Sequence, residues 1–312
     1  MNLEALVAPL RADVVSGAAV VARAAAAAMR RGAVQLPASS SSELRLELEA
    51  LALRVMEAQP AMAPLVELLT STLAAVRDDA PLDDSRRAAA EATERFRLQL
   101  EERGGRVASI LASEIPEGST VLTLSSSSTV RSGLVEARDR GLTVICLEGR
   151  PMNEGQGLAR TLAHAGIPVI LAVDAAAESL VPTADVVLLG ADSVGDAGVV
   201  NKIGSLALAR CAATHAVPVW VAADRTKWLP PGFPQLFQDD RPPEEVWRGA
   251  RGVRVWNRYF ERLPFDLVHR IVSDSGALNP DELALRRSNL DVAPVLRDWA
   301  ASRVITEPNN AR

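Results

Sequence analysis

From Ser119 onward, short apolar runs alternate with segments of helical length, and this alternation limits the folds open to the chain. Five runs have the length of a buried strand and are rich in Val, Ile and Leu: residues 120–124, 142–147, 168–173, 185–189 and 217–222. Strand–helix–strand alternation predicts a parallel sheet covered by helices on both faces. We therefore expect an α/β fold with a Rossmann-like parallel-sheet domain over residues 116–312.

The first 115 residues predict a separate helical domain. They are rich in Ala and Leu, residues of high helix propensity, and are interrupted by Ser and Pro clusters. The helices expected there are residues 3–31, a capped helix that begins at Ser42, residues 65–77, and a charged helix over 83–100. We expect the pair Gly104 and Gly105 to disturb the continuation of this last helix.

Composition narrows the class of protein further. Aromatic residues make up only 4% of the chain, which suits helices and buried parallel strands better than an all-β sandwich. The formal net charge of -5 argues against a nucleic-acid-binding or membrane-surface protein.

The two cysteines, Cys146 and Cys211, lack the spacing of a disulfide framework and are typical of buried thiols in a reducing compartment. Without a signal peptide or a membrane-spanning apolar run, the expected localisation is cytoplasmic.

In parallel sheets, ligands bind beyond the carboxyl ends of the strands, so the residues that follow each strand are the informative ones. Ser125 and Ser126 follow the first strand and open a run of five hydroxyl residues. These side chains and their amides suit a phosphate, but they equally suit a helix N-cap. Arg150, after the second strand, is a phosphate clamp or a surface turn residue. Asp174, after the third strand, is interpreted as a helix cap.

The most informative stretch follows the fourth strand. Asp192 stands at the strand end, and Asn201 and Lys202 follow within a glycine-rich segment that leads into a helix. A buried carboxyl there suits proton transfer, and an amide with an ammonium at a helix start suits sugar or phosphate oxygens. A glycine-rich loop with a capping Asp is the plainer alternative. Lys227, after the fifth strand, either reaches the same pocket or extends into solvent.

Neither a metal nor a cofactor is expected. The three histidines, His164, His215 and His269, are scattered and show no ligand spacing. A nucleophile elbow, a P-loop and a paired-Cys motif are also absent from the sequence.

The order and spacing of several motifs identify a resemblance to a known family. The segments LTLSSSS, LEGRP, GIPVILAVDAAA, GADSVGDAGVVNKIGS, VPVWVAADRTK and VWNRYFE resemble the initiation factor 2B alpha/beta/delta-subunit family. That family also contains methylthioribose-1-phosphate isomerase and ribose-1,5-bisphosphate isomerase. The similarity is strong over about residues 105–280 and weaker in the N-terminal part.

The resemblance implies a helical N-terminal domain, a Rossmann-like C-terminal domain and a homodimer or higher homo-oligomer. In the isomerase branch, an Asp and a Cys act on a sugar 1-phosphate and convert an aldose into a ketose phosphate. The Asp falls on Asp192. The substrate-binding positions fall on Arg150, Asn201, Lys202 and Lys227.

Three positions depart from the isomerase pattern. Ser125 stands where the isomerases carry Cys, and a hydroxyl ionises far less readily than a thiol. Ser16 and Gln59 stand where two arginines contact the substrate phosphate, and each lost charge-assisted bond removes about 1.5–3 kcal/mol. In the other direction, Asp192 is retained where regulatory alpha subunits typically carry Glu.

Two functions follow from the resemblance and its departures. The first is an aldose–ketose isomerase for a ribose-1,5-bisphosphate or related pentose 1-phosphate, with Asp192 as general acid/base and Ser125 as a hydrogen-bonding partner. Ser126, Arg150, Asn201, Lys202 and Lys227 would position the ligand. The second is a non-catalytic regulatory subunit that binds a sugar phosphate or a nucleotide. The expected partner is thus a small phosphorylated molecule rather than nucleic acid or membrane.

Overall fold

The structure, a computed structural model, describes residues 2–14, 16–237 and 240–304. The chain divides into two compact units. The first consists of Met1–Glu102, Thr226–Gln235 and Arg286–Arg312, and the second of Arg103–Arg225 and Leu236–Leu285. No helix among the described residues is long and apolar enough to cross a bilayer. The domain boundary expected at residue 115 stays a prediction, and residues 305–312 of the expected second domain lie outside the described part.

The first unit is built from helices, as the composition predicts. They are α1 (Leu3–Ala12), α2 (Ala18–Gln35), α3 (Ser41–Ala58), α4 (Pro64–Ala74), the N-terminal part of α5 (Leu82–Glu114), and α11 (Pro294–Val304). The start of α3 lies one residue before the expected Ser42. Its N-cap is Ser40, whose hydroxyl accepts the Glu43 N–H at 3.1 Å, so the capping interaction satisfies a first-turn amide.

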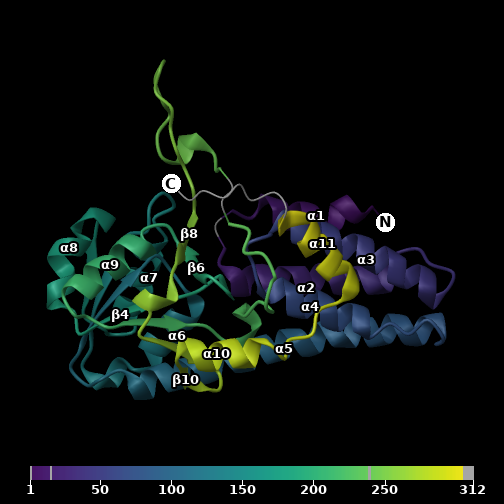
Figure 1. The fold of residues 1–312 in the computed structure, drawn as a ribbon, viewed down its shortest axis with the longest axis horizontal. Helices are drawn as coiled ribbons and strands as arrows, with labels where there is room; N and C mark the ends of the chain where they lie inside the picture. Colours follow the sequence, from purple (N-terminus) through teal and green to yellow (C-terminus); the bar gives the residue numbers. More distant parts are fainter. Residues whose placement is uncertain (1, 15, 238–239, 305–312) are drawn as a thin grey trace. The chain divides into compact units, whose positions relative to one another are not determined.

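Helix α5 passes through Gly104 and Gly105 without a break, and the expected disturbance there was wrong. Each glycine weakens a helix by roughly 0.8–1 kcal/mol relative to Ala. Beyond them, Val107, Leu111 and Ile115 are buried in the core of the second unit. Burial of such an apolar stripe outweighs the weak local propensity of two glycines. Figure 1 shows α5 as one long continuous helix.

The second unit contains a seven-stranded sheet of order β10-β9-β7-β4-β1-β2-β3. All five predicted strands are present: β1 (Thr120–Leu124), β2 (Thr143–Leu147), β3 (Val169–Ala172), β4 (Val186–Leu189) and β7 (Val219–Ala222). They pair in parallel, which confirms the Rossmann-like prediction. Two further strands, β9 (Arg270–Ser273) and β10 (Gly276–Leu278), extend the edge next to β7, and α10 (Pro280–Arg287) follows.

One core layer of this unit lies between one face of the sheet and the helices that cover it. Apolar residues of α5, α6 (Ser128–Glu136) and α7 (Glu154–His164) form one buried cluster with those of β1, β2 and β4. On the way from β3 the chain forms the short α8 (Ala177–Leu180), and α9 (Ser205–Thr214) contacts β4. Strands β1, β2 and β3 follow one another toward one edge of the sheet, and the chain then crosses back to place β4 on the other side of β1. The switch point of the sheet therefore lies between β1 and β4.

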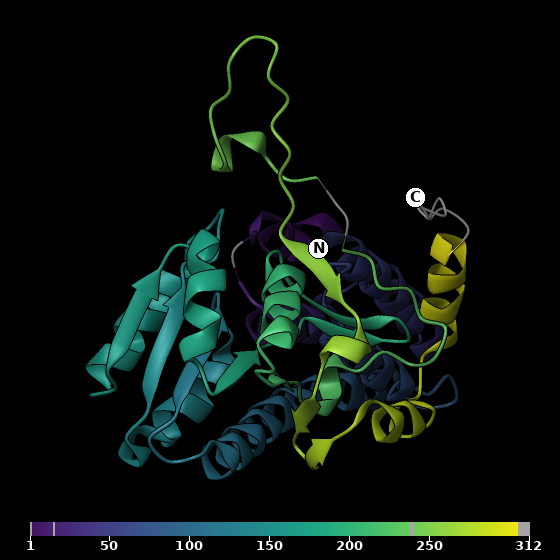
Figure 2. The same ribbon diagram turned by 60° about the vertical axis from the view of Figure 1, so that its left-hand side comes forward.

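A second, antiparallel sheet was not predicted from the sequence. It consists of β5 (Ser193–Gly195), β6 (Gly198–Lys202) and β8 (Phe260–Leu263), in the order β5-β6-β8. Figure 2 shows the chain ahead of β8 as a long excursion that stands away from the rest of its unit. In the register, Lys202 lies opposite Phe260 and Asn201 opposite Glu261. The segment expected to be a glycine-rich loop is therefore largely a hairpin.

The uninterrupted α5 gives a stability prediction. A Cβ added at the exposed Gly105 meets nothing within 4 Å. The variant Gly105→Ala should therefore be more stable than the wild type by about 0.5–1 kcal/mol, because Ala loses less backbone entropy in a helix. Chemical denaturation followed by circular dichroism measures this difference.

Gly133 of α6 supplies the control. A Cβ there would lie 2.9 Å from the Leu111 side chain, so Gly133→Ala should lower stability. A loss of stability in Gly105→Ala would contradict a continuous helix at this position.

Candidate active site

Ser125 is the first candidate residue after β1, and its backbone conformation is unusual. Its φ of 65° lies in the left-handed region, which non-glycine residues rarely occupy. Its N–H donates to the Leu147 carbonyl at 3.3 Å. A Cβ on the neighbouring Gly149 would lie 2.8 Å from the Ser125 Cα. The β1 and β2 ends therefore approach so closely that only glycine fits at position 149. Ser126 is half-buried beside it, and Ser127 caps α6.

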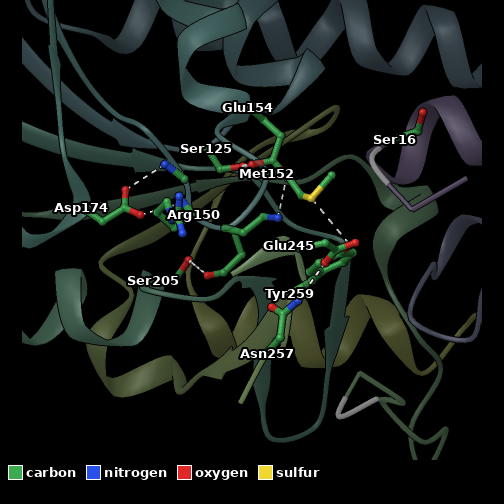
Figure 3. A network of polar contacts seen from close by, with 12 residues as sticks. Ser16, Ser125, Arg150, Met152, Glu154, Asp174, Ser205, Glu245, Asn257 and Tyr259 are labelled. Atoms are coloured by element: carbon green, nitrogen blue, oxygen red, sulfur yellow. Dashed lines mark hydrogen bonds and ion pairs between the residues drawn. The ribbon is translucent and has the colours of Figure 1, made fainter. Parts of the chain in front are cut away.

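The turn after β2 is held by an acidic residue from the next strand end. The Asp174 carboxylate accepts the N–H groups of Gly149 and Arg150 at 2.8 and 2.7 Å. The Asp174 side chain does not cap the short helical turn Asp174–Ala176, so the interpretation of Asp174 as a helix cap was wrong. The exposed Arg150 guanidinium donates to the Val246 carbonyl at 3.1 Å. Figure 3 shows Arg150 and Asp174 side by side in this turn.

Asp192 lies between β4 and β5, at the carboxyl edge of the parallel sheet. Its residue is 8% exposed and its N–H donates to the Val200 carbonyl at 2.9 Å. This bond fixes the Asp192 backbone against β6, the strand that carries Asn201. Asp192 therefore follows β4, one of the two strands that flank the switch point, at the edge where a ligand is expected.

Asn201 and Lys202 end β6 rather than begin a helix, which corrects their expected placement. Asn201 Nδ2 donates to Ser205 Oγ at 3.0 Å, and that hydroxyl donates to the Lys202 carbonyl at 2.7 Å. The Glu261 carboxylate, from β8, accepts the N–H groups of Gly204 and Leu206 at the start of α9. Burial raises the pKa of Glu261, against the effect of these two bonds.

A buried ion pair organises the centre of the site. Lys202 Nζ lies 2.6 Å from Glu154 Oε1, with side chains only 8% and 13% exposed. The other carboxylate oxygen, Oε2, accepts the Ser125 hydroxyl at 3.3 Å. Glu154 is the first residue of α7, where the helix dipole also favours negative charge. One carboxylate thus joins the end of β6 to the end of β1, as Figure 3 shows for Ser125 and Glu154.

Two aromatic rings lie next to the Lys202 ammonium: Phe260, the first residue of β8, and Tyr259, which precedes it. Lys202 Nζ lies 5.0 Å from the centre of the Tyr259 ring and 5.7 Å from that of Phe260. The Tyr259 hydroxyl donates to Glu245 Oε1 at 2.5 Å, and burial raises the pKa of this phenol. Asn257 donates to the second oxygen of Glu245 at 2.8 Å. Cation–π contacts and the ion pair together hold Lys202 in one place.

Six of the predicted site residues belong to the second unit: Ser125, Ser126, Arg150, Asp192, Asn201 and Lys202. Lys227 is 3% exposed in the short turn Arg225–Lys227, and it groups with the first unit, so its approach to the others stays a prediction. Gln59 also belongs to the first unit, where its Nε2 donates to the carbonyls of Leu10 and Asp13. Both amide hydrogens therefore bind the chain's own backbone.

Glu154 and Tyr259 were missed as site residues by reasoning from the sequence. Glu154 is 48 positions before Lys202 and opens a helix after a Pro-containing turn, a place where Glu is common without any function.

The two cysteines do not substitute for a thiol at position 125. Cys146 is fully buried inside β2, and burial raises its pKa to about 12.

The fold and the position of these residues define a class of ligand-binding Rossmann-like proteins with a helical companion unit. A model of the initiation factor 2 subunit family matches residues 14–280. The chain belongs to this family.

Relatives and solved structures agree with that assignment. The chain is 30% identical to the ribose 1,5-bisphosphate isomerase of Haloferax volcanii over 94% of both chains. It is 30% identical to that of Pyrococcus furiosus over 85% of this chain and 87% of the relative. The crystal structure of the Pyrococcus horikoshii OT3 translation initiation factor eIF-2B has a TM-score of 0.78 at 29% identity, covering 89% of this chain and 97% of that one.

The buried pair leads to a prediction on stability. Glu154→Gln leaves the Lys202 ammonium buried without its counter-charge, so the unfolding free energy of the second unit should fall by about 3–5 kcal/mol. Adding Lys202→Met should recover much of this loss, because the double variant has no buried charge at this place. A double-mutant cycle on denaturation midpoints measures the coupling.

The control is Glu94→Gln, which breaks an ion pair with Arg97 on the exposed side of α5 and should leave stability almost unchanged. Additive effects of the Glu154 and Lys202 substitutions would contradict the ion pair.

Proposed function

We propose that the chain is a sugar-phosphate isomerase that converts an aldose 1-phosphate of the ribose 1,5-bisphosphate type into a ketose phosphate. The observation that carries this proposal is the buried group of Asp192, Asn201 and Lys202 on one hairpin at the sheet's switch point. It occurs in a chain 30% identical to ribose 1,5-bisphosphate isomerases over 94% of both chains. Relatives named methylthioribose-1-phosphate isomerase, such as that of Gemmatimonas aurantiaca at 32% identity over 53% of this chain, support the same reaction class.

The reaction needs proton transfers and no oxidant. On ring opening the C1–O4 bond breaks and O4 takes up a proton, while O1 keeps its phosphate. The hydrogen on C2 then moves to C1 and O2 gives up its hydroxyl proton, which balances the proton taken up by O4, so that C2 becomes the carbonyl carbon. Asp192 is assigned as the general acid and base for these transfers, because it is a buried carboxyl at the place where a ligand binds. Lys202 is assigned to the developing negative charge on the sugar oxygens.

Glu154 and Ser125 are assigned to positioning rather than to nucleophilic chemistry. The Glu154 carboxylate fixes both the Lys202 ammonium and the Ser125 hydroxyl. It also makes the local charge around Lys202 neutral, which suits a hydroxyl or carbonyl oxygen of the sugar there better than a phosphate dianion. Phosphate binding is assigned to Arg150, Ser126 and the amides at the start of α6, with Lys227 as a further contact.

A regulatory binding function is the second candidate. The observation that favours it is Ser125, which stands in the position of the isomerase Cys while neither of the chain's cysteines is an exposed thiol. In this alternative the same groups bind a sugar phosphate or nucleotide without turnover.

The substitution Asp192→Asn separates the two candidates. A phosphorus and carbon NMR time course with ribose 1,5-bisphosphate and methylthioribose 1-phosphate should show a ketose signal with the wild type. In the variant, kcat should fall by at least about 10², the usual contribution of a general acid/base, while ligand-induced shifts persist.

The matched control is Asp196→Asn, an exposed carboxyl in the turn of the same hairpin, which should leave turnover unchanged. Turnover equal to the wild type in Asp192→Asn would remove this residue from the mechanism. Ligand binding by the wild type without any conversion would favour the regulatory function.

We also propose that the protein is cytoplasmic and works as a homodimer or higher homo-oligomer, as its resemblance to multisubunit factors implies. The free, buried state of Cys146 and Cys211 is consistent with a reducing compartment. Light scattering coupled to size-exclusion chromatography at micromolar concentration should give a mass of at least two chains. A mass of about one chain across the concentration range would contradict the assembly.

A further inference from the structure

A cluster of three potential metal ligands lies on helices α8 and α9. It consists of Glu178 from α8, and Cys211 and His215 from the end of α9. The Glu178 carboxylate oxygen, the Cys211 Sγ and a His215 ring nitrogen all lie within 4.8 Å of one another. Among them, His215 Nε2 and Glu178 Oε1 are 3.2 Å apart. Three donor atoms of different kinds therefore converge on one point.

The geometry of α9 explains how two of them meet. Cys211 and His215 are four residues apart, and side chains with this spacing lie on one face of a helix. The His215 N–H donates to the Cys211 carbonyl at 3.2 Å, so the helical turn that relates them is formed. The third donor comes from α8, which contacts α9. The spacing of the histidines alone does not reveal this Cys–His pair.

The chemistry of the three donors selects the kind of cation. A thiolate sulfur, an imidazole nitrogen and a carboxylate oxygen are ligands of Zn²⁺, whereas Mg²⁺ and Ca²⁺ take oxygen ligands. Three protein ligands leave a fourth tetrahedral position for water. Cys211 is 8% exposed, while Glu178 and the His215 side chain are reached by solvent at 72% and 32% exposure. A cation can thus enter from the surface and bind a sheltered sulfur.

We propose that Glu178, Cys211 and His215 form a surface Zn²⁺ site that joins α8 to α9. The site lies at the C-terminal end of α9, whereas Ser205 begins this helix three residues after Lys202. A helix of 10 residues is about 15 Å long at 1.5 Å per residue. The ion therefore stabilises the packing of α8 on α9 and takes no part in the chemistry proposed at Lys202. Metal binding releases the thiol proton, as it does at other cysteine sites.

Co²⁺ and Zn²⁺ titrations of the full-length, chelator-treated protein test this site. Co²⁺ should produce the thiolate-to-metal absorption of a Co–S bond with a stoichiometry of one, and Zn²⁺ should abolish it. Cys146 is fully buried within β2, so this absorption reports on Cys211. Calorimetry should give one Zn²⁺ per chain, bound with an affinity on the order of micromolar, and Zn²⁺ should raise the melting temperature.

Two variants and one control decide the outcome. Cys211→Ser should remove the Co–S absorption, and His215→Ala, at a more exposed position, should weaken Zn²⁺ binding at least about tenfold. His164→Ala changes an exposed histidine at the end of α7 and should bind like the wild type. Absence of the Co–S absorption, or Zn²⁺ binding that is the same in all four proteins, would overturn the proposal. Isomerase activity is not used as a readout, so the result is independent of the function proposed above.

Discussion

The buried pair of Lys202 and Glu154 is the interaction around which the candidate site is arranged. Moving an ammonium out of water costs several kcal/mol, and only a close counter-charge offsets this cost. Glu154 supplies that charge at 2.6 Å and uses its second oxygen for Ser125. The ends of β6, β1 and α7 therefore have to meet at one carboxylate. Each of the three elements brings a different part of the chain to the carboxyl edge of the sheet.

Glycines make this convergence possible. Gly149 lets the turn after β2 approach the Ser125 Cα, where a side chain would clash. Gly190 plays the same part after β4, since a Cβ there would lie 2.5 Å from the Ser127 side chain. The backbone between β1 and β4 is thus packed as tightly as a protein core. Such tight packing is suited to holding polar groups at fixed distances, which both a catalytic and a regulatory site require.

The sequence predicted the parallel sheet because its strands are continuous apolar runs, the pattern of strands buried on both faces. It did not predict β5, β6 and β8, whose short hairpin and distant partner lack that pattern. Asp192, Asn201 and Lys202 were predicted as site residues because they follow a predicted strand. Glu154 was not, because its role depends on a contact across 48 residues, and local chemistry around it indicates only a helix start. The continuity of α5 at Gly104 likewise depends on burial of its C-terminal part in the core, and local helix propensity carries no information on such burial.

The order of the small antiparallel sheet has a consequence for biosynthesis. Strand β6, which carries Asn201 and Lys202, lies between β5 and β8. One of its two neighbours, β8 (residues 260–263), therefore comes some 60 positions later in the chain. While the chain emerges from a ribosome, the parallel strands β1 to β4 are complete long before this strand arrives. The contacts around Lys202 are thus among the last of its unit to form, since non-local pairing has to wait for the whole intervening segment to be translated.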